Sequence, residues 1–486
     1  MRLESLADFL EALSDAGELA RVTAEVDPAL EIAQLTDQAA RAGGPALLFE
    51  RVRGGQAVVV ANLFGSDRRI CMALGIDSLE LATARGEQLT DAATRPTWLD
   101  RLKRGEAAGL ERFEPKQVKQ APCQQVVQLA SDVDLAALPA LQSWSEETGR
   151  AITAGQLLTV DRATGRRVWQ TLTLPVLGPN RLAVPLSPLD AAWPAWESAV
   201  AAGEPLAVAV VLGGSPLAML LGELPLGAQV DPLTLAGFWS GEPLSVVPAR
   251  SQSLEVPAAA EIVLEGIIDP AAPLVDGGRI VLPSGLYQPL SNCLTLELTA
   301  VTRRTNAAFP ARVAARPPSE ATAVDRLVER LLLPAVQQIA PEVVDLALPS
   351  FGARHQFLFV AIRKRYAHQA RKVAGALWGM ESLMLTKTIV LVDEDVSVRD
   401  AEQVLFQIGV HLVPGRDVFF AEGPTSDSQP AAIHSAAAPK LGLDATRKLP
   451  AEGAARSPQV AENDPATIQL LRSRWQEYGL DLPEPS

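Results

Sequence analysis

One short loop gathers residue types that could do chemistry. It runs from Val275 to Val281 and places Asp276 and Arg279 three positions apart, with two glycines between them. A carboxylate can act as a general acid or base, and a guanidinium can pair with an acid. Pairing of Arg279 with Asp276, which would hold the loop together, is favoured over a catalytic role for the arginine.

Two other groups of reactive side chains have simpler interpretations. The run Asp393–Asp395 contains three acidic residues and resembles a metal cluster, but a solvated strand end in which Asp395 caps the next helix is favoured. The cysteines, Cys71, Cys123 and Cys293, have no neighbouring histidine or cationic cluster. Core packing is therefore favoured over a nucleophilic role for them.

The composition indicates a protein of several domains in a reducing compartment. The chain has 486 residues, of which 48% are hydrophobic, and this length predicts about two to four domains. The net charge of −14 argues against nucleic acid as a partner, because phosphate backbones require clustered Lys and Arg. The odd number of dispersed cysteines and the acidic N-terminus predict a cytoplasmic protein. Glycines and a proline interrupt the uncharged stretch Pro205–Leu226, so no stable membrane insertion is expected.

The loop that contains Asp276 joins two predicted strands, Glu261–Ile268 and Cys293–Thr302. In the second, Leu294, Leu296 and Leu298 alternate with polar residues, which is the pattern of a half-buried strand. A structureless connection of about two dozen residues is uncommon and often functional. With further runs, these strands predict a barrel with helices on its outside; the runs are Gln125–Leu129, Ala151–Val160, Arg167–Leu174, Leu182–Pro185 and Leu206–Leu212.

The elements predict an α/β (α+β) protein with five segments. Residues 1–122 form an α/β part, residues 123–310 the barrel domain, and residues 311–333 a proline-rich linker and helix. Residues 334–460 form a three-layer α/β domain, and residues 461–486 a terminal helix and tail. The helix predicted for Ala466–Tyr478 places Ile468, Leu471 and Trp475 on one face. Docking on a second subunit and docking on its own domain both remain open.

A series of short motifs runs along nearly the whole chain. They are Gly17–Leu19, Glu25–Pro28, Gly44–Glu50, Asn62–Ser66, Glu255–Pro257, Glu261–Gly266, Gln369–Lys372, Asp393–Val396, Pro414–Asp417 and Asp444–Lys448. In these motifs the chain resembles the UbiD-like decarboxylases, which use prenylated flavin. The resemblance implies an N-terminal α/β part, a central split β-barrel that binds flavin, and a C-terminal α/β domain with a terminal helix. It also implies reversible, non-oxidative decarboxylation of aromatic or α,β-unsaturated acids, including quinone precursors.

The chain departs from this family at the positions that hold the metal. In the family an Asn, a His and a Glu hold a divalent metal, manganese, and potassium at the flavin phosphate. By alignment of the motifs, Val168 stands in place of the Asn and Pro232 in place of the Glu, with Asp231 one residue away. The region of the metal His reads Leu186–Leu189, and no histidine precedes His355. We therefore predict no metal ligands.

The acid–base positions are also altered. Where the family has an Arg and two acidic residues, this chain has Thr173, Asp276 and Val281. Asp276 is thus the predicted catalytic residue, while Glu261 and Glu265 lie on a strand and are predicted to be structural. The predicted cofactor contacts are Thr171, Thr173 and Lys387.

Lys387 stands where the family has a lysine on the flavin phosphate; a strand-edge lysine in water is an equal alternative. Prenylated FMN with manganese and potassium is implied by the family, but the substitutions predict that this cofactor is not bound in its usual form.

Three functions are compatible with the sequence. The first is a working UbiD-like decarboxylase. The second is a degenerate, non-catalytic homologue that serves as a partner subunit or scaffold, either as a homo-oligomer, a dimer or larger, or with an intact homologue. The third is a binder of a less charged small molecule in an apolar pocket lined by Trp169, Leu172 and Leu186. Loss of most of the polar site residues favours the second over the first, because a flavin phosphate would remain unpaired.

Overall fold

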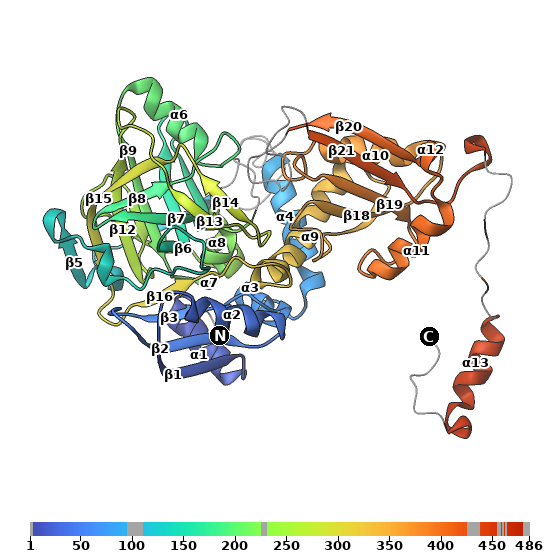
Figure 1. Cartoon of the computed structure of the whole chain (residues 1–486), viewed down its shortest axis with the longest axis horizontal. Coiled ribbons are helices and arrows are strands. Elements are labelled where there is room, and N and C mark those ends of the chain that lie inside the picture. The colour runs from blue at the N-terminus through green and yellow to red at the C-terminus, as the bar shows by residue number, and fades with distance from the viewer. Residues whose placement is uncertain are drawn as a thin grey trace.

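The computed structural model describes residues 3–94, 110–224, 231–424, 438–453, 458, 461 and 464–479. Figure 1 shows three modules: an N-terminal α/β layer, a barrel beside it, and a second α/β layer that contains the C-terminal sheet. Residues 95–109 and the end of the tail lie outside the described residues. None of the described helices is both long and apolar enough to span a membrane.

The N-terminal layer is a four-stranded sheet covered by helices. Its strand order is β1-β2-β3-β16, so a strand that follows the barrel in sequence completes the N-terminal sheet. The elements are α1 (Leu6–Asp15), β1 (Leu19–Val26), α2 (Glu31–Arg41), β2 (Ala46–Val52), β3 (Val58–Ala61), α3 (Asp67–Leu74), α4 (Ala82–Thr94) and β16 (Ala308–Ala311). Helix α1 begins at a capping box between Ser5 and Asp8, and it buries Leu6, Phe9 and Leu13.

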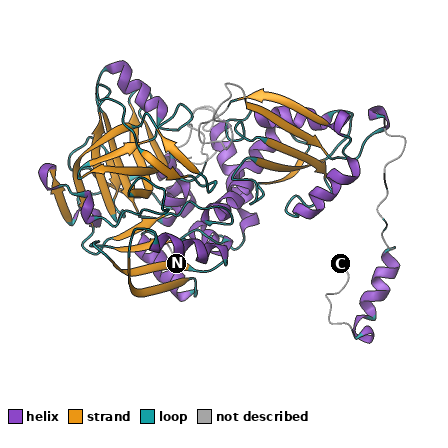
Figure 2. Cartoon of the chain, viewed as in Figure 1, coloured by secondary structure: helices purple, strands orange, loops and turns teal. Residues whose placement is uncertain are grey.

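The central module is the predicted barrel. Its strands are β5 (Val126–Leu129), β6 (Ala151–Asp161), β7 (Arg166–Gly178), β8 (Arg181–Val184), β9 (Leu206–Leu212), β12 (Ile262–Ile268) and β15 (Leu294–Arg303). Six of them follow the order β12-β9-β6-β7-β8-β15, and pairing of β12 with β15 closes the ring, with β5 added at its side. Every pairing is antiparallel. Figure 2 shows these strands as a curved wall with helices around it.

Helices and a small sheet surround the barrel. They are α6 (Trp193–Ala202), α7 (Pro216–Leu221), α8 (Pro232–Ser240), β4 (Lys116–Gln117), β10 (Ser245–Pro248) and β11 (Glu255–Pro257). Alternate barrel residues enter two separate apolar cores: Leu157, Val210 and Leu264 point into the barrel, whereas Leu158 and Val211 face α7 and α8. This alternation follows from the two-residue period of a strand.

The expectation of a structureless loop around Asp276 is wrong. The segment contains a hairpin, β13 (Gly278–Val281) paired antiparallel with β14 (Tyr287–Leu290). The turn includes Gly285 with φ of +80°, and a Cβ there would lie 2.3 Å from the Cα of Arg316. Only glycine fits such a position. Strands this short give too little alternation to be recognised in the sequence.

The C-terminal layer is a mixed sheet of order β17-β18-β19-β21-β20, as predicted. Its elements are α9 (Glu320–Ile339), β17 (Val343–Ala347), β18 (Phe357–Ile362), α10 (Gln369–Trp378), β19 (Thr388–Asp393), α11 (Ala401–His411), α12 (Pro414–Asp417), β20 (Val418–Gly423), β21 (Ala438–Asp444) and, past the sheet, α13 (Pro465–Ser473). The predicted cap of α11 is wrong: Asp400 caps it, because the Asp395 carboxylate instead pairs with Arg447 at 2.5 Å.

The two predicted structural glutamates fasten the barrel to its surroundings. The fully buried Glu265 accepts hydrogen bonds from Arg250 N at 2.9 Å, and from Ser251 N at 2.6 Å and Oγ at 2.8 Å. Glu261 accepts from Ala308 N at 3.0 Å and lies 3.3 Å from the Arg304 guanidinium. Both therefore hold segments next to the barrel, which confirms their structural role.

Replacing Glu265 with glutamine should lower the free energy of unfolding by about 1–3 kcal/mol, because an amide NH2 would face buried donors. The matched control is Glu297→Gln on the paired strand β15, where the side chain is exposed. That change should cost less than about 0.5 kcal/mol. Urea denaturation followed by tryptophan fluorescence measures both. Equal stabilities of the two variants would contradict the structural role.

Candidate functional site

Strand β7 carries the positions at which the site was predicted, and its side chains alternate between two environments. Val168 and Leu172 pack against the core inside the barrel. Trp169 belongs to the core on the α7 side and donates from Nε1 to Ala218 O at 2.9 Å. Thr171 and Thr173 share the Trp169 side of the strand by the same two-residue period. The strand therefore places the predicted cofactor contacts and the Val168 position on opposite faces.

The region that aligns with the family's metal ligands, at which no ligands were predicted here, contains apolar packing and a closed turn. The side chain of Val168 is a hydrocarbon and has no atom that could bind a metal ion. Gln170 lies two residues after Val168 on the same face of β7, and its Nε2 donates a hydrogen bond to Asp190 at 3.1 Å. The Asp190 carboxylate also accepts from Ser187 N and Oγ, both at 2.7 Å. The segment Leu186–Leu189 is thus held by a carboxylate and contains no imidazole.

Asp231, one residue from the predicted Glu position, is fully engaged by the start of α8. It caps the helix by accepting from Leu233 N at 3.1 Å and from Thr234 Oγ1 at 2.8 Å. Its second oxygen also forms an ion pair with Arg167. The other side of the Arg167 guanidinium lies 3.6 Å from Glu255. No group of three or more His, Cys, Asp or Glu in the described residues could hold a metal ion.

Thr171 is hydrogen bonded within the chain. Its hydroxyl accepts from Gln156 Nε2 at 2.7 Å, and its backbone N donates to Gly222 O at 2.9 Å. Gly222 permits this contact, because a Cβ there would lie 1.7 Å from Gln156 Oε1. The next residue, Glu223, forms an ion pair with Arg312. The Thr171 hydroxyl and the Glu223 carboxylate are therefore partnered, whereas the buried Gln156 Oε1 has no hydrogen-bond partner among the described residues.

Asp276 and Arg279 do not form the predicted pair. Asp276 is exposed and accepts from Gly278 N at 2.8 Å. Arg279 instead pairs with Glu146 at 2.6 Å and lies 4.6 Å over the Tyr287 ring. The partner Glu146 belongs to the segment before β6, so the pair holds the hairpin against the barrel rather than within the loop.

Lys387 directly precedes β19 and is exposed. Its backbone oxygen accepts from Leu441 N at 2.8 Å. Among the described residues, no hydrogen bond or ion pair joins its side chain to Asp276, Thr171 or Thr173. The structure thus places the predicted site residues on a barrel face, on a hairpin and on a separate sheet, without direct contact between them.

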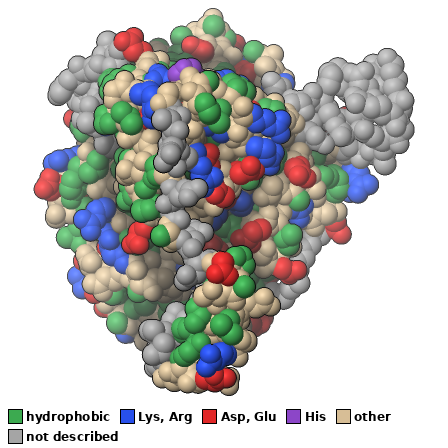
Figure 3. Space-filling model, turned by 90° about the vertical axis from the view of Figure 1, so that its right-hand side faces the viewer, with side chains coloured by type: hydrophobic (Ala, Val, Ile, Leu, Met, Phe, Trp, Pro, Cys, Tyr) green, Lys and Arg blue, Asp and Glu red, His purple; other side chains and the backbone are tan. Residues whose placement is uncertain are grey.

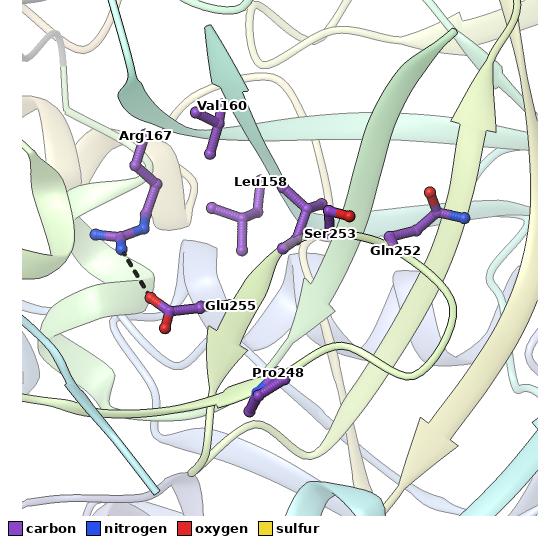
Figure 4. A pocket seen from close by; sticks show the side chains of 8 residues that line it. Leu158, Val160, Arg167, Pro248, Gln252, Ser253 and Glu255 are labelled. Atoms are coloured by element: carbon purple, nitrogen blue, oxygen red, sulfur yellow. Dashed lines mark ion pairs between the residues drawn. The ribbon is translucent and has the colours of Figure 1, made fainter. Parts of the chain in front are cut away.

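A pocket of about 380 Å³ lies beside the Arg167 ion pairs (Figure 4). Its lining is Leu158, Val160, Arg167, Pro248, Gln252, Ser253, Leu254 and Glu255. The predicted pocket of Trp169, Leu172 and Leu186 is wrong, because Trp169 lies in one core and the two leucines pack against the other. No local sequence pattern indicated the observed pocket, since its residues come from separate segments.

The cysteines and the acidic run have structural surroundings. Cys71, Cys123 and Cys293 are free and buried. Burial raises the pKa of all three thiols, that of Cys123 to about 11, so the thiolate form is disfavoured. In the acidic run, Asp393 accepts from Arg447 N at 2.7 Å and Glu394 pairs with Arg363 at 2.9 Å.

Comparison with known proteins identifies the same family in all three modules. Models of 3-octaprenyl-4-hydroxybenzoate carboxy-lyase match in order: the N-terminal domain over residues 10–89, the Rift-related domain over 116–317 and the C-terminal domain over 322–445. A protein of Aquifex aeolicus, described only as uncharacterized, is 35% identical over 485 residues, which cover 99% of each chain.

Solved structures agree with this result. The UbiD-class enzyme HmfF of Pelotomaculum thermopropionicum, in complex with FMN, is 28% identical with a TM-score of 0.80, covering 96% of this chain and 99% of that chain. An evolved dimeric form of HmfF was solved with prFMN. Vanillic acid decarboxylase of Sedimentibacter hydroxybenzoicus is 25% identical and covers 98% of each chain. Its closed form gives a TM-score of 0.85 and an open form 0.78, so the arrangement here is nearer the closed form.

The cysteine environments predict a protein without a reactive thiol. With Ellman's reagent at pH 8, the native chain should react slowly, because the buried thiols stay protonated. After denaturation, all three cysteines in the sequence should react at once. One thiol that reacts within seconds in the native protein would restore the nucleophile interpretation.

Proposed function

Because the chain belongs to the UbiD carboxy-lyase family, we propose that it retains the family fold without the metal-dependent, prenylated-flavin decarboxylation. The family reaction places a flavin phosphate beside a divalent metal, and such a metal takes oxygen ligands such as carboxylates. In this proposal the barrel acts as a scaffold and does not contain an active site.

The engagement of Asp231 is the observation that carries the proposal. Its two oxygens already serve the α8 cap, Thr234 and Arg167. Recruiting it to a metal would break these contacts and leave the half-buried Arg167 without its main counter-charge, a loss that costs several kcal/mol for a buried pair. Val168 and Pro232 offer no ligand atoms in their side chains. The residues present therefore do not fit the metal, and we derive no reaction step through it.

The charge balance also opposes a bound phosphate. Arg167 is adjacent to Val168 in sequence but lies on the Thr171 face of β7, where it faces both Asp231 and Glu255. The three groups together carry one net negative charge when ionised. A phosphate at this place would meet that excess negative charge, and its burial without added cations is unfavourable.

The role that fits a retained fold without its site is assembly. We infer that the chain associates with itself, as a dimer or a larger homo-oligomer, or with an intact family member as a non-catalytic partner subunit in the cytoplasm. Family similarity that spans every module supports this, because a scaffold requires the fold and its surfaces but not the metal ligands.

Coexpression with a flavin prenyltransferase tests the proposal. The purified chain should be colourless and contain far less than one flavin and one manganese per chain, and EDTA should leave its melting temperature unchanged. HmfF, produced in the same way, is the positive control for flavin loading. One flavin and one manganese per chain would overturn the proposal.

Should decarboxylation of an aromatic or α,β-unsaturated acid nevertheless be found, Asp276 is the proposed acid–base residue. Asp276→Asn should then lower kcat by at least about 100-fold, the usual contribution of a positioned acid or base. Asp269→Asn, in the loop after β12, is the matched control and should keep full activity. An unchanged rate for Asp276→Asn would remove this residue from the reaction.

The Arg167 pocket supports a second candidate function, binding of a small ligand. Its volume of about 380 Å³ lies within the range of ligand sites. Leu158, Val160 and Leu254 give it an apolar part, while Glu255 adds a half-exposed carboxylate to a cluster with excess negative charge. These features favour a small apolar molecule that carries a cationic or hydrogen-bond-donating group.

Ligand-observed NMR with benzylamine, which is a cation at pH 7, tests this pocket. Benzylamine should bind, benzoate should not, and Glu255→Gln should weaken benzylamine binding about tenfold, the effect of ~1.4 kcal/mol. Glu242→Gln, on the loop after α8, is the control. Equal binding of benzylamine and benzoate would exclude a charge-selective pocket.

A further inference from the structure

Arg69 of helix α3 is a charged side chain that is fully buried. Charged side chains usually lie in water, as do those seen on the face of the molecule in Figure 3. Arg69 is instead 0% exposed, and its Nη1 donates to Glu18 at 2.8 Å and to Gly44 O at 3.1 Å. Its Nε and Nη2 have no hydrogen-bond partner among the described residues. These two nitrogens form one side of the rigid guanidinium fork, so they can serve a single acceptor.

Asn62 provides a buried acceptor atom beside this fork. Its Nδ2 donates to Pro45 O at 2.9 Å, but its Oδ1 has no hydrogen-bond partner in the described part of the chain. A Cβ on Gly65 would lie 1.9 Å from Asn62 Oδ1 and 2.9 Å from Arg69 Nη2. The missing side chain of Gly65 thus allows an unpaired acceptor and an unpaired donor to approach the same point.

Glu320, the first residue of α9, provides a second buried acceptor. It is 4% exposed, and its Oε1 accepts from Phe64 N at 2.8 Å, one residue before Gly65. Its Oε2 has no hydrogen-bond partner among the residues that the structure describes. Burial raises the pKa of this carboxyl, while the charges of Arg312 and Arg69 act in the opposite direction. The Arg69 guanidinium therefore lies within electrostatic reach of Glu320.

The unpaired atoms at this junction define what could bind between them. Buried polar groups in native proteins are rarely left without a hydrogen bond. With Glu320 ionised, the junction offers two donor atoms, Arg69 Nε and Nη2, and two acceptors, Asn62 Oδ1 and Glu320 Oε2. A metal cation here would be repelled by Arg69, and an anion would be repelled by the Glu320 carboxylate. A neutral molecule that both donates and accepts twice fits the set, and water is the smallest such molecule.

We propose that this junction binds one buried water molecule, which accepts from Arg69 and donates to Asn62 Oδ1 and Glu320 Oε2. The site joins the loop Asn62–Ser66 and helix α3 of the N-terminal layer to helix α9. Because α9 also packs against β17 of the C-terminal sheet, the water completes a polar joint between the N-terminal layer and the helix that leads to the C-terminal layer. This site goes beyond the proposed function and does not depend on whether flavin binds.

A high-resolution crystal structure of the full chain tests the site directly. Burial raises the pKa of Glu320, so crystals grown at pH 8 favour its ionised form. One density peak should lie within about 3.2 Å of Arg69 Nη2, Asn62 Oδ1 and Glu320 Oε2. Crystals soaked in sodium bromide should show no anomalous signal at this peak. A bromide peak would overturn the proposal in favour of an anion site, and a direct Arg69–Glu320 contact without a peak would overturn it as well.

A double-mutant cycle tests the shared site in solution, with melting temperature as the measurement. Arg69→Met and Glu320→Gln should each lower the melting temperature by roughly 4–8 °C. The double variant should melt no lower than the less stable single variant, because one water serves both residues. Simple addition of the two shifts would contradict a shared water.

The matched control is Arg68→Met. Arg68 pairs with the same Glu18 carboxylate at 3.1 Å, but its side chain is 63% exposed. This change should lower the melting temperature by less than about 2 °C, as expected for an exposed ion pair. Its shift should add to that of Glu320→Gln, because Arg68 takes no part in the site. Equal non-additivity of Glu320 with Arg68 and with Arg69 would overturn the specific role of Arg69.

Discussion

A charged group that leaves water must meet a partner inside the protein, and the site region of this chain meets that requirement with its own residues. Arg167 faces Asp231 and Glu255, and Glu223 faces Arg312. Among the neutral polar groups, Gln156 Nε2 is hydrogen bonded to Thr171, while the buried Gln156 Oε1 has no partner among the described residues. Because these charged groups already pair with one another, a phosphate or a metal beside them would have to displace an existing partner.

The barrel does not depend on the chemistry of that site. Apolar side chains alternate on both faces of its strands and enter two cores. Pairing of β12 with β15 closes the ring, and Glu265 fastens the neighbouring loop to it. Stability therefore resides in packing, closure and the glutamate contacts. A fold held together in this way does not require a bound metal, which is the physical basis of the proposed scaffold role.

The elements with strong local patterns could be predicted from the sequence. The expected strand Leu206–Leu212 coincides with β9, and the expected strand Glu261–Ile268 contains β12. The edge strand β1 and the hairpin β13–β14 could not be found, because one is mostly solvent-facing and the other is short. A strand could thus be predicted where its local hydrophobic pattern was strong, and it was missed where that pattern was weak or short.

Contacts between side chains that lie far apart in the chain could not be predicted from the sequence. Arg279 lies 133 positions from its partner Glu146, and the pocket joins residues of β6, β7 and the loop before β11. The expectation that Val168 and Pro232 stand at the family's ligand positions rests on the motif alignment, and neither side chain carries an atom that could bind a metal. What the structure adds is that Asp231, the remaining nearby carboxylate, is already engaged.

Native mass spectrometry of the chain, coexpressed with a flavin prenyltransferase and supplied with manganese, tests the central claim most directly. The account predicts assemblies whose mass is a whole multiple of 51.6 kDa, without added flavin or metal. A mass increase equal to one prenylated FMN and one manganese per chain would contradict it.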